Sequence, residues 1–190
     1  PSETFGRYFL LPGRIMWTKN IQLAIDAFRL LAERHPEFEL VVAGMVDRKS
    51  RPYFEELKAR AAGVEAIRFE TEVSDARMQE LYGNCRAVLM AAFNEDLGLT
   101  PIEGMARGKP AVAVARGGPR ETILEGETGF LVEPEATAFA GALARLAEDE
   151  ALARRMGEAA TRRAERFTWE SFVETFDAEI DRIVADAGRG

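Results

Sequence analysis

Six short apolar runs, separated by stretches with helical spacing, constrain the fold of this chain more than any other feature. The runs are rich in Val, Leu, Ile, Phe and Ala at successive positions, which is typical of strands buried on both faces of a parallel sheet. They occupy residues 8–11, 38–43, 66–69, 87–92, 111–115 and 129–132. Because helical patterns lie between most of them, we predict an α/β fold, a Rossmann-like, doubly wound parallel sheet of about six strands.

Helical patterns alone follow the last run, so we predict a helical C-terminal segment over residues 136–187. Its final helix carries an apolar stripe at helical spacing, formed by Phe172, Phe176, Ile180 and Ile183. A chain of 190 residues suits one domain with a sizeable core, and we expect a single domain over residues 1–190. The chain begins with Pro1 instead of Met, which suggests a processed chain or a piece of a longer one.

The composition argues against several functional classes. A net charge of −7 at pH 7 does not suit a general nucleic-acid-binding surface, which would be basic. No apolar run approaches the roughly 20 residues that span a bilayer, and the N-terminus does not resemble a signal peptide. Cys85 is the only cysteine, so a disulfide framework and a cysteine metal site are excluded. We therefore expect a reducing, cytoplasmic setting and no bound metal.

The loop after the first predicted strand carries two cations, Arg14 and Lys19, just before a helix. In doubly wound sheets ligands bind beyond the carboxyl ends of the strands, which is where this loop lies. Two cations beside a helix N-terminus are unfavourable unless an anion lies between them, and both side chains are common partners of phosphate. The pattern favours an anion site; the alternative is that both are solvated surface cations.

The stretch after the fourth predicted strand indicates a second part of such a site. An acidic loop leads to Thr100-Pro101-Ile102-Glu103, which has the pattern of a capping box with Thr100 at the N-cap. Gly98 would let the backbone approach a phosphate closely. The N–H groups of Leu99 and Thr100 would then point at that phosphate from the helix N-terminus.

Two glutamates of this stretch, Glu95 and Glu103, are candidates for binding the hydroxyl groups of a sugar, because ionised carboxylates are strong hydrogen-bond acceptors. The alternatives are a solvent-facing loop carboxylate for Glu95 and a purely capping role for Glu103. The chain has no G-x-G-x-x-G after the first strand and no P-loop motif. Dinucleotide-binding and P-loop functions are therefore disfavoured.

The seven-residue spacing of Glu95 and Glu103 resembles the E-x7-E signature of retaining glycosyltransferases of the GT-B fold. The family that it resembles most, glycosyl transferases group 1, includes bacterial and archaeal mannosyl- and glucosyltransferases. Four further segments match its pattern: 13–20, 117–121, 126–132 and 167–169. The resemblance covers nearly the whole chain and implies one half of a GT-B fold, the C-terminal, donor-binding half. The sequence departs from the pattern of this family at Asp96-Leu97, Gly104 and Thr71, which leaves open the class of nucleotide-sugar donor.

The resemblance also implies roles for individual residues. Arg14 and Lys19 would grip the donor diphosphate and stabilise the leaving nucleotide, and Glu95 would hold hydroxyls of the donor sugar. Glu103 would bind the ribose. The full set implied for donor binding is Gly13, Met45, Val73, Leu97, Gly98, Leu99, Thr100 and Glu103.

The implied reaction is the transfer, with retention of configuration, of a hexose from a nucleotide-sugar to a glycan or lipid-linked acceptor. Mannose is favoured, and the donor would be of the GDP-mannose or UDP-glucose type, with no cofactor or metal. The acceptor site would belong to a missing N-terminal domain, so we expect the isolated chain to be inactive; the full-length enzyme could associate peripherally with a membrane. The alternatives are a standalone nucleotide-sugar-binding module and a GT-B relative such as a phosphorylase or epimerase.

Overall fold

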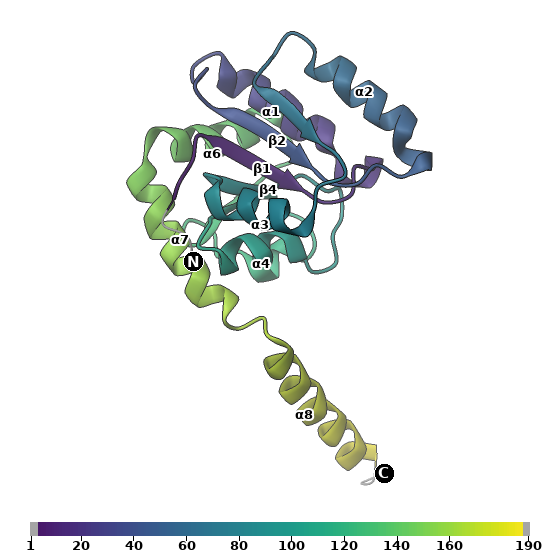
Figure 1. Cartoon of the computed structure of the whole chain (residues 1–190). Helices are drawn as coiled ribbons and strands as arrows, with labels where there is room; N and C mark the ends of the chain where they lie inside the picture. Colours follow the sequence, from purple (N-terminus) through teal and green to yellow (C-terminus); the bar gives the residue numbers. More distant parts are fainter. Residues whose placement is uncertain (1–3, 188–190) are drawn as a thin grey trace.

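A six-stranded parallel sheet forms the centre of the computed structural model, which describes residues 4–187 (Figure 1). The strand order is β3-β2-β1-β4-β5-β6. The strands are β1 Tyr8–Pro12, β2 Glu39–Ala43, β3 Ile67–Glu70, β4 Ala87–Met90, β5 Ala111–Val114 and β6 Gly129–Val132. All six predicted strands are present within two residues of their predicted bounds. The α/β, doubly wound fold class is confirmed.

Helices connect the strands and continue after the last of them. They are α1 Ile21–Ala32, α2 Arg51–Ala61, α3 Asp75–Asn84, α4 Leu99–Ala106, α5 Pro119–Thr122, α6 Ala136–Glu148, α7 Glu150–Ala164 and α8 Trp169–Ala187. Two short 3-10 turns, η1 Trp17–Lys19 and η2 Arg48–Ser50, precede α1 and α2. The segment after residue 135 is thus helical, as its sequence pattern indicates.

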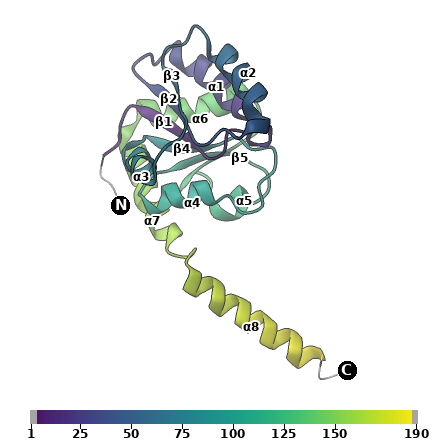
Figure 2. The ribbon, with the colours of Figure 1, turned by 45° about the vertical axis from the view of Figure 1, so that its right-hand side comes forward.

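Helices cover the sheet on both faces, which explains why its strands are apolar at successive positions. In β1, Phe9 and Leu11 belong to the large core that contains residues of α1, α2, α6 and α7. Leu10, between them, packs on the other face against Leu81 and Tyr82 of α3. Figure 2 shows α3, α4 and α5 on one side of the sheet and α1 and α6 on the other.

The winding of the chain reverses between β1 and β4. β1 pairs with β2 on one side and with β4 on the other, and Leu10 stands opposite Val41 and Val88 in the two ladders. The connections after β1 and β4 therefore leave the sheet toward opposite faces. A crevice opens between them at the carboxyl ends of the strands, where ligands bind in folds of this kind.

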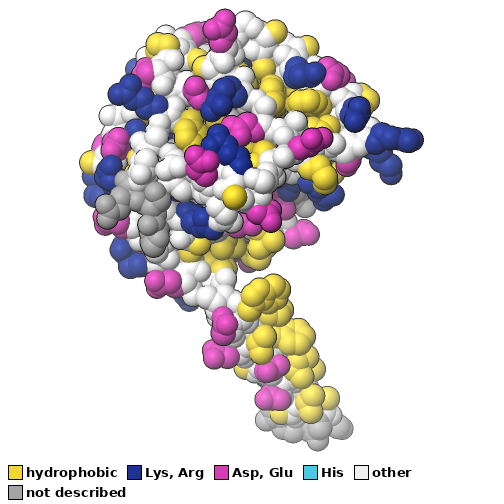
Figure 3. Space-filling model, in the orientation of Figure 1, with side chains coloured by type: hydrophobic (Ala, Val, Ile, Leu, Met, Phe, Trp, Pro, Cys, Tyr) yellow, Lys and Arg dark blue, Asp and Glu magenta, His cyan; other side chains and the backbone are white. Residues whose placement is uncertain are grey.

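The last helix, α8, stands away from the body of the protein (Figures 1 and 2). Its predicted stripe of Phe172, Phe176, Ile180 and Ile183 forms along one side, but none of its residues is buried. The space-filling view shows this stripe as a continuous apolar surface (Figure 3). Among the described residues, no helix has both the length and the apolar character that a membrane span requires.

Because α8 buries nothing in this chain, its removal should leave the stability of the sheet domain unchanged. A chain ending after Thr168 keeps Phe167, which packs against Ile102 and Met105. Its free energy of unfolding in urea should lie within about 0.5 kcal/mol of that of the whole chain. A control chain ending after Ala160 also loses Phe167 and should be clearly less stable. A loss above about 1 kcal/mol on removing α8 alone would contradict this picture.

Candidate functional site

Three contacts join the loop after β1 to the loop after β4. The backbone N–H of Phe93 donates to the carbonyl of Thr18 at 3.2 Å. The rings of Trp17 and Phe93 lie with their centroids 5.8 Å apart. Lys19 Nζ forms an ion pair with Glu95 Oε2 at 2.6 Å. These contacts close one side of the crevice and bring together two loops that are far apart in the sequence.

A cavity of about 340 Å³ lies beside this junction, at the carboxyl ends of β1 and β4. Six of the residues predicted from the sequence line it: Gly13, Lys19, Glu95, Leu99, Thr100 and Glu103. Four further residues complete the lining: Pro12, Met78, Tyr82 and Met90. The sequence thus identified most of the charged and helix-terminal part of the cavity and missed its apolar part.

The helix α4 begins at Leu99, with Gly98 at the N-cap in a left-handed conformation at φ 83°. The predicted capping box is therefore wrong: Thr100 lies inside the first turn, and no side chain of the described residues caps this terminus. The positive φ of Gly98 allows the chain to enter the helix earlier than the Thr-Pro pattern indicates. The N–H groups of Leu99 and Thr100 belong to the first turn, where an α-helix offers them no acceptor of its own.

Glu103 contacts Tyr82 instead of the helix terminus. The hydroxyl of Tyr82, in α3, donates to Glu103 Oε2 at 2.5 Å. Burial of Tyr82 raises the pKa of its hydroxyl, and the hydrogen bond to Glu103 raises it further, so the group stays protonated and donates. Tyr82 is not among the site residues that the sequence predicts. A tyrosine on a buried stripe still needs a partner for its hydroxyl, which is the signal that could have found this contact.

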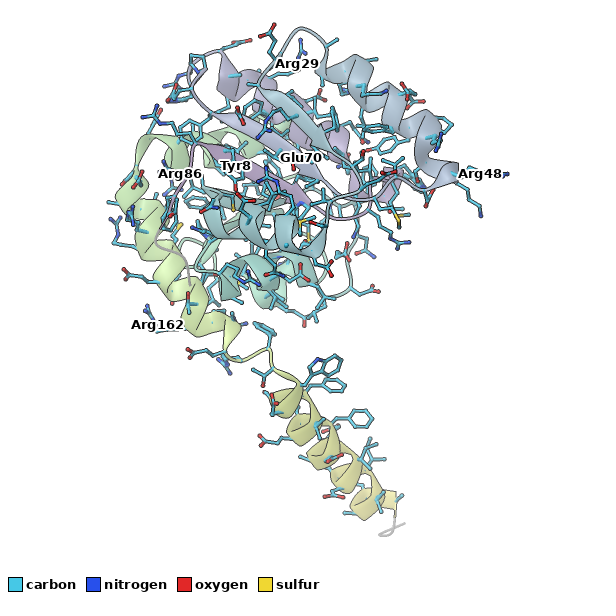
Figure 4. The ribbon with its side chains drawn as sticks, in the orientation of Figure 1. Tyr8, Arg29, Arg48, Glu70, Arg86 and Arg162 are labelled. Atoms are coloured by element: carbon cyan, nitrogen blue, oxygen red, sulfur yellow. The ribbon has the colours of Figure 1, made fainter. Side chains whose placement is uncertain are left out.

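Two polar contacts fix α3, and with it Tyr82, against the sheet. Glu70, at the end of β3, forms a two-pronged ion pair with Arg77, with both N···O distances at 3.0 Å. The guanidinium of Arg77 lowers the pKa of this carboxyl. The hydroxyl of Tyr8, in β1, donates to the carbonyl of Leu81 at 2.7 Å. Tyr8, on β1, and Glu70, at the end of β3, are labelled in Figure 4.

Gly117 and Gly118 pack directly against the backbone of the acidic loop, at Glu95–Leu97. The N–H of Gly118 donates to the carbonyl of Glu95 at 2.7 Å. A Cβ at Gly117 would lie 2.4 Å from that same carbonyl oxygen, and a Cβ at Gly118 would lie 2.4 Å from the carbonyl oxygen of Asp96. Only glycine fits at these two positions without displacing the loop, so they determine where the backbone of Glu95 lies.

The remaining predicted site residues do not line this cavity. Met45 and Leu97 are exposed, and Arg14 is an exposed side chain of the β1 loop. Arg14 lies near Asp47. Its charge helps to lower the pKa of the Asp47 carboxyl, which is lowered mainly by hydrogen bonds from Ser50. Val73 packs against the apolar cluster beneath α3. For these residues the proposed contacts with a ligand stay predictions.

Residues 3–163 match the sequence model of the family described as glycosyl transferases group 1. The chain belongs to this family. It is 30% identical to the alpha-1,3/1,6-mannosyltransferase ALG2 of Dictyostelium discoideum, over 93% of this chain and 46% of that protein. The chain thus spans about half the length of this relative.

Solved structures of glycosyltransferases share the fold. A structure of Anabaena Alr3699/HepE in complex with UDP and glucose superposes with a TM-score of 0.80 and 25% identity. That match covers 95% of this chain and 48% of the other. The C-terminal domain of a glycosyl transferase group 1 family protein (LpcC) from Francisella tularensis gives a TM-score of 0.76 and 26% identity. There the match covers 87% of this chain and 88% of the other, so the two have nearly the same extent.

The contact between Tyr82 and Glu103 should contribute to stability as a charge-assisted hydrogen bond. Tyr82→Phe should lower the free energy of unfolding by about 1.5 kcal/mol, since it removes the donor of a partly buried hydrogen bond to a carboxylate. In a cycle of urea unfolding measurements, Tyr82→Phe should cost less in a Glu103→Gln background, where the acceptor is neutral. Equal costs in both backgrounds would show that Tyr82 and Glu103 are not coupled.

Proposed function

We propose that this chain binds a nucleotide-sugar in the cavity between the β1 and β4 loops and forms the donor-binding half of a retaining glycosyltransferase. The observation that carries the proposal is the meeting of Lys19, Glu95 and Glu103 with the N-terminus of α4 in one cavity. The likeness to a structure that holds UDP and glucose supports it. The likeness to a C-terminal domain of the same family supports the assignment to the C-terminal half.

The diphosphate of the donor binds at the N-terminus of α4. The N–H groups of Leu99 and Thr100 and the positive end of the helix dipole attract an anion there. Lys19 supplies a positive charge at the same cavity, and the exposed Arg14 reaches the diphosphate from the same loop. Gly13 and Gly98 let the backbone lie close to it.

The two glutamates bind the two sugars of the donor. Glu95 accepts hydrogen bonds from hydroxyls of the transferred hexose, whose other contacts come from the backbone at Leu97. Glu103 binds the ribose hydroxyls through the carboxylate oxygen that Tyr82 does not hold. Met45 and Val73 flank the base.

The transfer is driven by electrostatic stabilisation of the leaving group. The bond between the anomeric carbon and the diphosphate oxygen breaks while the acceptor oxygen bonds to the same face of that carbon. The acceptor proton passes to the departing diphosphate. Arg14, Lys19 and the first turn of α4 lie where negative charge grows during this step, which is the arrangement that favours it. We propose no metal or cofactor for this reaction.

We favour mannose as the transferred sugar, with GDP-mannose as donor, because of the sequence motif and the likeness to a mannosyltransferase. The UDP in the similar Anabaena structure supports the other candidate, a donor of the UDP-glucose type. We further propose that the acceptor site lies in an N-terminal half absent from this chain, that the isolated chain does not transfer sugar, and that the enzyme works in the cytoplasm. We also propose that a full-length enzyme of this kind can associate peripherally with a membrane.

Charge changes in the cavity should weaken nucleotide binding without affecting the fold. Lys19→Met and Glu103→Gln should each raise the Kd for the bound nucleoside diphosphate about tenfold, since each removes a charge-assisted contact. Calorimetric titration with GDP, UDP and ADP measures this. Lys58→Met is the matched control, because Lys58 also forms an ion pair, with Glu55 at 2.7 Å on α2, and does not line the cavity. An unchanged Kd in both cavity variants would refute the assignment of the site.

The isolated chain should bind the donor without transferring the sugar to an acceptor. Saturation-transfer difference NMR or calorimetric titration should detect binding of the nucleotide-sugar. An assay with radiolabelled donor and a mixture of glycan and lipid-linked acceptors should show no turnover. Transfer at about 1 s⁻¹ or faster, a rate typical of enzymes, would contradict the need for a second half. Failure to bind any nucleotide-sugar would contradict the proposed function itself.

A further inference from the structure

We propose that Glu95 makes the site prefer a nucleotide-sugar over a free nucleoside diphosphate, because its carboxylate competes with the diphosphate for Lys19 unless sugar hydroxyls engage it. This inference rests on the proposed function and adds a specificity role to one residue of the same site. It follows from an ion pair that occupies the place where the donor is proposed to bind.

The ion pair lies inside the cavity and is largely shielded from water. Lys19 Nζ and Glu95 Oε2 are 2.6 Å apart, and the two side chains retain 25% and 26% of their exposure. Both residues line the cavity, together with Leu99 and Thr100 at the start of α4. A diphosphate at this helix terminus would therefore compete with a carboxylate that already neutralises the nearest lysine.

Both partners extend from backbone that is held in place. The carbonyl of Glu95 accepts from Gly118, whose contacts leave the loop no room to retreat. The N–H of Lys19 donates to the carbonyl of Met16 at 3.0 Å, and Asn20 after it has a left-handed φ of 50°. The pair can therefore open by rotation of the two side chains, without movement of either loop.

The charges that line the cavity favour this competition. Among the described residues of the lining, Lys19 is the one cation, whereas Glu95 and Glu103 are both acidic. A free nucleoside diphosphate brings further negative charge next to Glu95 and takes away its partner. A nucleotide-sugar brings the same diphosphate but also hydroxyl donors, which satisfy the carboxylate that Lys19 releases. Only the second ligand leaves every charged group with a partner.

The same competition would help the product to leave. After transfer, the hexose departs with the acceptor and Glu95 loses its hydroxyl partners. The carboxylate then returns to Lys19 and weakens the hold of the site on the remaining nucleoside diphosphate. Lys19 thus changes partner twice in each cycle, between Glu95 and the diphosphate.

The test compares two ligands on one set of variants. Calorimetry gives the Kd values of GDP and GDP-mannose, or of UDP and UDP-glucose if that pair binds the natural chain. Glu95→Gln keeps the size of the side chain and removes its charge. We expect it to lower the Kd of the nucleoside diphosphate about fivefold, the scale of one partly shielded ion pair, and to leave the Kd of the nucleotide-sugar unchanged or raised.

Three controls make the expectation specific to this pair. Glu55→Gln removes the carboxylate of a similar ion pair on α2, at 2.7 Å from Lys58, and should change neither Kd. Asp96→Asn removes the same charge from the neighbouring position of the same loop and should have a clearly smaller effect than Glu95→Gln. In a Lys19→Met background most of the gain from Glu95→Gln should disappear.

The results separate this inference from the proposed function. Weaker or unchanged binding of the nucleoside diphosphate by Glu95→Gln would overturn the inference, and so would an equal gain from Asp96→Asn or a gain that persists in Lys19→Met. In each of those cases the natural chain still binds the nucleotide, and the proposed function stands. Absence of binding to the natural chain would overturn the proposed function, and the inference with it.

Discussion

The reversal of winding between β1 and β4 is the constraint on which the rest of this structure depends. Since the chain leaves these adjacent strands toward opposite faces, their loops separate and a crevice opens between them. The loops then meet again through Thr18 and Phe93 and through Lys19 and Glu95. A cation from one half of the sheet thereby faces a carboxylate from the other.

Glycines, more than the charged residues, determine how closely the backbones of these loops approach. The carbonyl of Gly13 would lie 1.9 Å from a Cβ at Gly44, so the ends of β1 and β2 approach as closely as the backbone allows. Gly117 and Gly118 do the same for the acidic loop. The charged side chains therefore extend from backbone with little freedom to move, which suits the diphosphate site that we propose.

The fold could be predicted from the sequence because most strands are apolar at successive positions, as strands covered on both faces of a parallel sheet are. The site could be predicted only in part. Charged residues that follow apolar strands are expected at the carboxyl edge of a parallel sheet, where ligands bind, and this made it possible to predict Lys19, Glu95 and Glu103. The role of Tyr82 could not be predicted, because its ring fits the apolar stripe of α3. The partner of its hydroxyl, Glu103, lies far away in the sequence and contacts it only in the folded chain. The start of α4 depends on the φ of Gly98, which local pattern does not specify.

The capping box predicted at Thr100 is wrong, and the uncapped start of α4 that replaces it is what makes anion binding at this helix terminus possible. Had Thr100 capped the helix, its side chain would have taken one of the N–H groups that an anion needs, and Glu103 would have faced the terminus as well. With Gly98 in that place, the first turn keeps its donors. Glu103 is held by Tyr82 through one oxygen, so the other can accept bonds from a ligand. The contact with Tyr82 and the ribose-binding role that we propose would then use different atoms of one carboxylate and would not compete.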